Sequence, residues 1–168
     1  SLTMPPFFLN FFFEQDPNTS VVAMHVEDLK DGRAFAEVAT RVSKVKPVVV
    51  LKAGRTSLGA KAANSHTGAL AGDDRIYDSV LRQSGVIRAK SLNDMLEFAR
   101  GLSVLPTPKG ENVLILTGAG GSGVLLSDAC VDNGLSLMTM PDDLDAAYRE
   151  FIPPFGAAGN PVDITGGE

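Results

Sequence analysis

The sequence has few of the residues that form disulfides and metal centres. Cys130 is the single cysteine among 168 residues, so no disulfide can form within the chain. A structural zinc site takes about four Cys or His ligands, and one cysteine with two histidines cannot supply them. We therefore expect neither a disulfide framework nor a metal site.

Long apolar runs and an excess of basic residues are also missing. A membrane-spanning helix needs roughly 20 apolar residues in succession, whereas the nearest candidate, residues 5–13 (PPFFLNFFF), is short and interrupted by Asn10. These residues also lack the basic start and the cleavage site of a signal peptide. The 15 basic and 20 acidic residues give a net charge of −5, which disfavours nucleic acid and anionic membranes as partners. We expect a cytoplasmic protein.

Apolar runs alternate with helical patterns in the first two thirds of the chain. Residues 21–26, 48–51 and 86–87 predict buried strands, because their apolar residues are continuous and not alternating. Helical spacing predicts helices between and after these strands, at residues 33–43, 75–84 and from Ser91 to Leu102. This order predicts an α/β fold with a parallel sheet covered by helices on both faces.

A segment rich in Pro and Gly, residues 105–110, predicts a linker, and a second βαβ unit follows it. Its predicted elements are a strand at 113–116, a Gly-rich turn at 117–123, a helix at 124–133, a strand at 135–138 and a helix from Pro141 to about Phe151. We therefore divide the chain into domains at 1–108 and 109–168.

His66 is the first candidate for chemistry. It lies in residues 52–72, which contain four glycines and no apolar period and therefore predict a long loop after a buried strand. Open α/β sheets bind ligands at that edge, and an imidazole can act as a nucleophile. Glu27 follows the first strand at the same edge and could orient the imidazole. An ordinary loop histidine and an exposed turn glutamate are the alternatives.

The Gly-rich turn is the second candidate. It consists of Gly118, Ala119, Gly120, Gly121, Ser122 and Gly123, between a predicted strand and a predicted helix. Amide groups at a helix N-terminus bind anions, so the turn predicts phosphate binding. The spacing also matches a dinucleotide motif, but the next strand has no acidic residue before Asp142 to bind a ribose. A tight turn without a ligand is the alternative.

Five segments together carry a family resemblance: VEDLKDGR (26–33), KPVVVLKAGR (46–55), SHTGALAG (65–72), TGAGGSG (117–123) and NPVDITG (160–166). In this order they resemble the NDP-forming acyl-CoA synthetases (ADP-forming acetate–CoA ligases), relatives of succinyl-CoA synthetase. The resemblance covers the chain from about residue 7 onward. It implies flavodoxin-like domains: the C-terminal part of one at 1–108, with the phosphohistidine loop, and the N-terminal part of a second at 109–168.

The resemblance also implies a reaction and roles for residues. The family interconverts acyl-CoA, phosphate and ADP with an organic acid, CoA and ATP, through an acyl phosphate and a phosphohistidine. His66 matches the phosphorylated histidine, and Ser65, Thr67 and Gly68 lie in its loop. Glu27 matches the glutamate that supports this histidine, although Asp28 follows it where relatives often have glycine.

Partners and cofactors follow from the same resemblance. CoA, and ATP or ADP with Mg²⁺, are expected to bind mainly to CoA-binding and ATP-grasp domains that are absent from this chain, and the substrate is an acyl-CoA or organic acid. We expect the chain alone to bind no cofactor tightly, to be inactive and to be able to form homo-oligomers. Two other functions stay open: a non-catalytic binding or regulatory module, fused to an acyltransferase in a longer protein, and a nucleotide-dependent oxidoreductase.

Overall fold

The structure is a computed structural model, and it describes residues 15–67 and 73–164. The chain forms two compact units, Ser1–Thr107 and Pro108–Glu168, which are treated separately below. The division lies within the segment that the sequence predicts as a linker. In the described residues, no helix is both long and apolar enough to cross a membrane.

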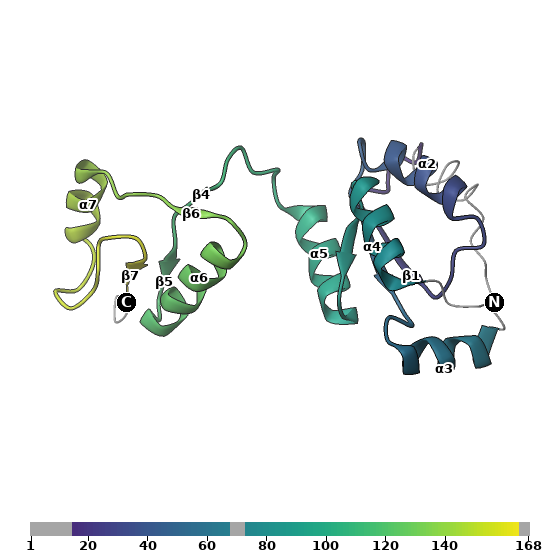
Figure 1. Cartoon of the computed structure of the whole chain (residues 1–168). Helices are drawn as coiled ribbons and strands as arrows, with labels where there is room; N and C mark the ends of the chain where they lie inside the picture. Colours follow the sequence, from purple (N-terminus) through teal and green to yellow (C-terminus); the bar gives the residue numbers. More distant parts are fainter. Residues whose placement is uncertain (1–14, 68–72, 165–168) are drawn as a thin grey trace. The chain divides into compact units, whose positions relative to one another are not determined.

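The first unit contains a three-stranded parallel sheet with strand order β1-β2-β3. Val22 of β1 pairs with Val48 of β2, and Val49 of β2 pairs with Ile87 of β3. The elements of this unit, shown in Figure 1, are β1 (Val22–Val26), α2 (Gly32–Val42), β2 (Val48–Lys52), α3 (Ser57–Thr67), α4 (Asp74–Gln83), β3 (Ile87–Ala89) and α5 (Leu92–Val104).

Helices cover both faces of this sheet, which confirms the predicted α/β fold. On one face, side chains of β1 and β2 pack against α2 and α4. On the other face, Val49 and Ala89 pack against Met95 of α5. The central strand β2 is therefore buried on both sides, which explains its continuous apolar sequence. Asp31, Asp73 and Ser91 cap helices α2, α4 and α5 with their side chains.

Helix α3 corrects the prediction of a loop over residues 52–72. Gly54, with φ +70°, turns the chain after β2. The Thr56 hydroxyl then accepts a hydrogen bond from the Gly59 amide at 3.1 Å, which caps the helix. The helix was missed because it has no apolar stripe: its sequence, SLGAKAANSHT, consists mostly of small and polar residues, and Leu58 is 80% exposed.

The described residues of the second unit form short strands and two helices. Its strands form two parallel pairs, β4 with β6 and β5 with β7. Its elements are β4 (Asn112–Val113), β5 (Leu116–Thr117), α6 (Gly120–Asp132), β6 (Ser136–Leu137), α7 (Asp142–Arg149) and β7 (Val162–Asp163).

Two predictions for the second unit are wrong in detail. Residues 113–116 form parts of two strands with different partners, and not one strand. Helix α6 begins at Gly120, four residues before the predicted start, so most of the predicted turn is helical. Glycine has a low helix propensity, and for that reason the sequence favoured a turn at this position.

The Asn160 side chain links the strands of the second unit at residues 113–116, where the single predicted strand is divided into two. Its Oδ1 accepts a hydrogen bond from the Ile115 amide at 3.0 Å. Its Nδ2 donates to the carbonyl groups of Val113 at 2.8 Å and Met138 at 3.0 Å. One side chain thus joins the segments of β4, β5 and β6.

Candidate functional site

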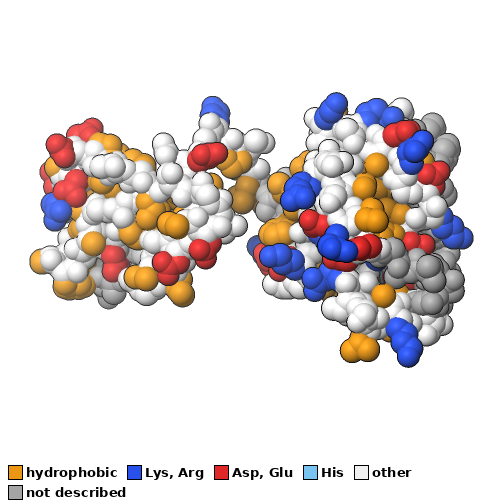
Figure 2. Space-filling model, viewed as in Figure 1, with side chains coloured by type: hydrophobic (Ala, Val, Ile, Leu, Met, Phe, Trp, Pro, Cys, Tyr) orange, Lys and Arg blue, Asp and Glu red, His pale blue; other side chains and the backbone are white. Residues whose placement is uncertain are grey.

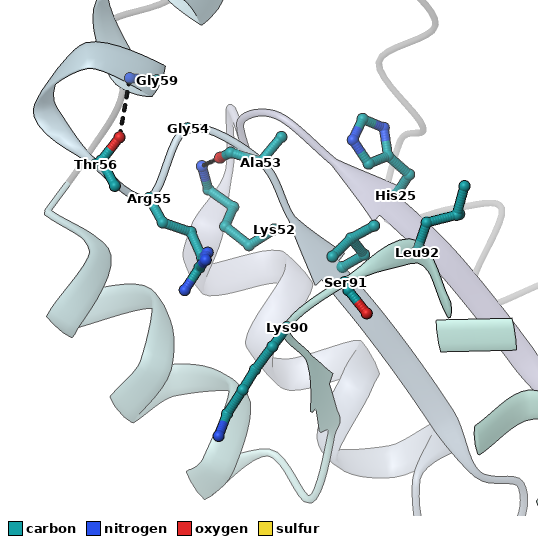
Figure 3. A pocket seen from close by; sticks show the side chains of 11 residues that line it. His25, Lys52, Ala53, Gly54, Arg55, Thr56, Gly59, Lys90, Ser91 and Leu92 are labelled. Carbon is teal, nitrogen blue, oxygen red and sulfur yellow. Dashed lines mark hydrogen bonds between the residues drawn. The ribbon is translucent and has the colours of Figure 1, made fainter. Parts of the chain in front are cut away.

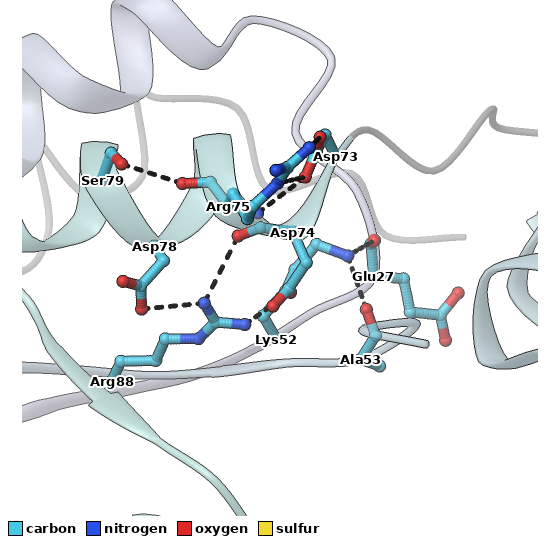
Figure 4. A network of polar contacts seen from close by, with 9 residues as sticks. All are labelled: Glu27, Lys52, Ala53, Asp73, Asp74, Arg75, Asp78, Ser79 and Arg88. Atoms are coloured by element: carbon cyan, nitrogen blue, oxygen red, sulfur yellow. Dashed lines mark hydrogen bonds and ion pairs between the residues drawn. The ribbon is translucent and has the colours of Figure 1, made fainter. Parts of the chain in front are cut away.

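The carboxyl ends of β1 and β2 are joined by a buried lysine. Lys52, the last residue of β2, is 2% exposed. Its ammonium group donates hydrogen bonds to the carbonyl oxygens of Glu27, at 2.7 Å, and of Ala53. Figure 4 shows the Glu27 carboxylate directed away from this ammonium group. Lys52 therefore fixes the backbone of Glu27 and not its carboxylate.

Tyr77 of α4 completes this cluster. The Lys52 ammonium group lies 4.5 Å from the centre of the Tyr77 ring. The Tyr77 hydroxyl donates to Asp28 Oδ1 at 2.7 Å and accepts from the Leu29 amide at 3.2 Å. Residues 27–29 are thus held both by β2 and by α4.

The buried position changes the acid–base properties of both side chains. Burial lowers the pKa of Lys52, although nearby carboxylates, Asp74 first among them, act in the opposite direction. Burial, together with the hydrogen bond to Asp28, raises the pKa of Tyr77. Sequence reasoning missed both residues. The signal for Lys52 was present, because a lysine ends a strand that is otherwise apolar (VVVLK).

His66 lies on the segment between Lys52 and Tyr77, both of which belong to this cluster. It is the residue before last of α3, so Ser65, His66 and Thr67 belong to a helix and not to a loop. His66 is ten residues beyond Thr56, about 15 Å along the helix axis. The Ser65 hydroxyl donates to the Lys61 carbonyl at 3.0 Å.

The rest of the predicted loop, residues 68–72 with Gly68, lies outside the described residues. Helix α4 then begins at Asp74 and carries Tyr77 back to Lys52. The segment bearing His66 is therefore tied at both ends to the cluster that positions Glu27. That Glu27 pairs with His66 stays a prediction.

The predicted phosphate-binding turn lies at the N-terminus of α6. Gly118 and Ala119 precede the helix, whereas Gly120, Gly121, Ser122 and Gly123 form its first turn. Ala119 provides no side-chain cap for the helix. The Thr117 hydroxyl accepts from the Ala119 amide at 3.0 Å and donates to the Ala119 carbonyl at 2.9 Å. The approach to the helix is thus ordered by Thr117.

A carboxylate approaches the same turn. A Cβ atom on Gly120 would lie 2.8 Å from Asp163 Oδ2, and a Cβ atom on Gly123 would lie 3.2 Å from Pro161 Cβ. Both glycines therefore pack closely against the segment that ends in β7, and a side chain on Gly120 would displace the Asp163 carboxylate. A negative side chain near a helix N-terminus stabilises the helix, and it also opposes an anion bound at that end. Sequence reasoning missed this approach, which joins residues 43 positions apart.

Comparison with known proteins identifies the family. Residues 8–102 match the succinyl-CoA ligase like flavodoxin domain, and residues 113–168 match the ligase-CoA domain. The chain belongs to the succinyl-CoA ligase-like flavodoxin family. This finding confirms the resemblance and the flavodoxin-like fold class that the sequence indicates.

Named members of this succinyl-CoA ligase-like group are similar over most of the chain. The chain is 49% identical over 155 residues to the alpha subunit of acetate–CoA ligase [ADP-forming] I of Pyrococcus furiosus, which covers 92% of this chain and 33% of that protein. It is 41% identical over 150 residues to 4-hydroxybutyrate–CoA ligase [ADP-forming] of Nitrosopumilus maritimus, covering 88% of this chain and 21% of that protein. The chain thus spans a third or less of these relatives.

A solved structure of this family also superimposes well. It is that of Ca. Korarchaeum cryptofilum dinucleotide forming acetyl-coenzyme A synthetase 1 in complex with phosphate and ADP, with a TM-score of 0.87 and 45% sequence identity. The match covers 96% of this chain and 35% of that chain. In the described residues of the present chain, no group of three or more His, Cys, Asp or Glu side chains is placed to hold a metal ion.

Proposed function

We propose that this chain is the phosphohistidine-bearing part of an NDP-forming acyl-CoA ligase, with the phosphoryl group carried on His66. The observation that carries the proposal is the position of His66, on a segment tied at both ends to the Lys52 cluster. This cluster holds the backbone of Glu27, the residue assigned to support the histidine. Similarity to ADP-forming CoA ligases supports the same assignment.

The reaction proceeds through two phosphoryl carriers. Inorganic phosphate attacks the thioester of an acyl-CoA, the C–S bond breaks, and an acyl phosphate and CoA thiol result. An imidazole nitrogen of His66 then attacks phosphorus, the bond between phosphorus and the acyl oxygen breaks, and the organic acid leaves as a carboxylate. Finally, ADP takes the phosphoryl group from His66, which gives ATP and restores the imidazole.

Glu27 and the N-terminus of α6 have supporting roles in this proposal. The Glu27 carboxylate accepts a hydrogen bond from the second imidazole nitrogen and stabilises the positive charge that develops on the ring. The first turn of α6, from Gly120 to Gly123, binds the phosphoryl group through backbone amides. The nearby Asp163 carboxylate weakens this binding and so favours onward transfer of the group.

The remaining substrates and partners belong to the whole enzyme. CoA binds to a CoA-binding domain, and ADP or ATP binds with Mg²⁺ to an ATP-grasp domain. Both are domains or subunits that associate with this chain. The names of the relatives point to acetate and 4-hydroxybutyrate as examples of the acid. We place the reaction in the cytoplasm, where CoA and ADP are available, and homo-oligomers of the enzyme are compatible with it.

A turnover assay tests the proposal. The full-length protein is supplied with acyl-CoA, phosphate, ADP and Mg²⁺, and ATP formation is followed with acetyl, 4-hydroxybutyryl and other acyl groups. We expect ATP formation by the wild type, none by His66→Ala and a reduced rate for Glu27→Gln. Lys44→Ala, at an exposed residue just after α2, is the control. The isolated 168-residue chain should give no turnover.

Two results would contradict the proposal. Wild-type activity in His66→Ala would remove the histidine from the reaction. Failure of the full-length protein to form ATP from any acyl-CoA tested would favour a non-catalytic binding or regulatory module with the same fold.

A further inference from the structure

A cavity lies at the carboxyl ends of β2 and β3, where open α/β sheets bind their ligands. Its volume is about 350 Å³, and its walls include His25, Lys52, Arg55, Lys90 and Ser91 (Figure 3). Three of the residues that line it are lysine or arginine, and none is aspartate or glutamate. In a chain with a net charge of −5, such a lining indicates a place that attracts anions.

A second cavity continues the first. It has a volume of about 530 Å³ and is also lined by Arg55 and Lys90, so the two cavities form one groove. Arg75, Arg82 and Arg88 line the second part. Figure 3 shows the side chain of Lys90 extending away from His25. Arg55 and Lys90 are thus the residues that both parts of the groove share.

The carboxylates of the groove are already paired. Arg88, on β3, forms ion pairs with Asp74 and with Asp78, the latter at 3.0 Å (Figure 4). Burial by itself would lower the pKa of Arg88, but the two carboxylates outweigh it and raise that pKa. Arg75, which lines the groove, pairs at 2.9 Å with Asp73, which does not line it.

Three exposed cations also line the groove: Arg55, Arg82 and Lys90. Among the described residues, no ion pair joins the exposed side chains of Arg55, Arg82 or Lys90 to a carboxylate. Basic side chains are also concentrated in this unit, which has thirteen basic and eleven acidic residues, whereas the second unit has two basic and nine acidic residues. Figure 2 shows this contrast on one face of each unit.

We propose that the groove binds a phosphate dianion between Arg55 and Lys90. A guanidinium group offers two parallel N–H donors to a phosphate, and an ammonium group adds a compact positive charge. Two kinds of ligand carry such a dianion: free inorganic phosphate, and an organic phosphate whose remaining part extends toward Arg82. The binding itself does not depend on the reaction of His66. Its use as the entry site for the phosphate co-substrate rests on the proposed function.

Titration of the 168-residue chain tests the inference. Amide resonances of Gly54, Thr56 and Ser91 are followed by NMR as inorganic phosphate is added at constant ionic strength and slightly alkaline pH, with chloride as the reference anion. We expect saturable shifts with phosphate and none with chloride. The double variant Arg55→Gln/Lys90→Gln should bind about tenfold more weakly or worse. The variant Arg33→Gln/Lys44→Gln removes the same charge from exposed positions on and after α2 and should bind as the wild type.

A second titration distinguishes the two kinds of ligand. Phenyl phosphate replaces inorganic phosphate, and Arg82→Gln is compared with the wild type. Tighter binding of phenyl phosphate that Arg82→Gln weakens identifies an organic phosphate as the ligand, whereas equal binding of both compounds identifies inorganic phosphate. Equal shifts with chloride, or equal affinity in the Arg55→Gln/Lys90→Gln chain, would overturn the inference. Phosphate binding here, together with a full-length protein that is never phosphorylated on His66, would overturn the proposed function alone.

Discussion

The Lys52 ammonium group lies 2.7 Å from the carbonyl oxygen of Glu27. This contact joins the end of β2 to the residue that follows β1, and the Tyr77 ring covers it from α4. The backbone of Glu27 is therefore held by a side chain 25 positions away. The position of Glu27, the residue assigned to support His66, thus depends on Lys52. This lysine lies in β2, whereas His66 lies in α3.

Replacing Lys52 tests whether this contact stabilises the fold. Lys52→Met keeps the length of the side chain but leaves the carbonyl oxygens of Glu27 and Ala53 without their donor. We expect the free energy of unfolding to fall by about 1–3 kcal/mol, measured by urea denaturation. Lys44→Met, at an exposed position, should change it by no more than about 0.5 kcal/mol. Equal stability of the two variants would show that the buried ammonium group contributes nothing.

The lowered pKa of Lys52 predicts a pH dependence. An unfolded lysine has a pKa of about 10.4, and burial lowers the value in the folded chain. Between these two values the unfolded chain binds more protons at this position, so the contribution of Lys52 to the free energy of unfolding rises with pH. At lower pH both states bind the proton and the contribution is constant.

Urea denaturation of the wild type and Lys52→Met across this alkaline range measures the effect, because other titrating groups cancel in the difference. The stability of the wild type relative to the variant should rise as the pH approaches about 10.4. A difference that stays constant or falls would contradict the lowered pKa.

Two neighbouring glycines in the first turn of α6 should respond differently to the same change. A Cβ atom on Gly120 would lie 2.8 Å from Asp163 Oδ2, whereas one on Gly121 has no atom within 4 Å. Gly120→Ala should therefore cost about 1–3 kcal/mol through overpacking. Gly121→Ala should be neutral or stabilise by up to about 1 kcal/mol, because alanine has the higher helix propensity. Thermal unfolding compares them, and equal midpoints would contradict the close approach of Asp163.

The side chain of Asn160 should be needed for the second unit. Asn160→Ala removes the partner of the Ile115 amide and of the carbonyl groups of Val113 and Met138. We expect a loss of at least about 1–3 kcal/mol in the free energy of unfolding. Asn133→Ala, which removes one exposed hydrogen bond to the Ala129 carbonyl, should cost no more than about 1 kcal/mol. Similar losses in the two variants would remove Asn160 from its structural role.

Sequence patterns predicted the elements that depend on local properties. Continuous apolar runs lie in or beside β1, β2 and β3, and α2, α4 and α5 have periodic apolar residues with Asp or Ser at their N-caps. The prediction of a fully buried first strand is wrong in detail, because Ala23 and His25 of β1 are exposed. These signals follow from burial and capping, which act within a few residues. The parallel sheet and its helices on both faces could therefore be predicted.

The same patterns failed where structure depends on distant residues. Helix α3 has no apolar stripe, and α6 begins with glycines, so neither start could be read from periodicity. The division of residues 113–116 between two strand pairs depends on β6 and β7. For the site, His66 and Glu27 were proposed from motif and resemblance, and their roles stay predictions. Lys52 was missed because its partners, Glu27 and Tyr77, lie 25 residues away on either side.

The most direct test of the account is to locate the phosphoryl group. The full-length protein is incubated with ATP and Mg²⁺ and, separately, with acyl-CoA and phosphate, and is kept alkaline because phosphohistidine is acid-labile. The modified residue is then mapped by mass spectrometry. We predict phosphate on His66 and not on His25 under both conditions, none on His66→Ala, and less in Glu27→Gln. Absence of phosphate from His66 under both conditions would contradict the account.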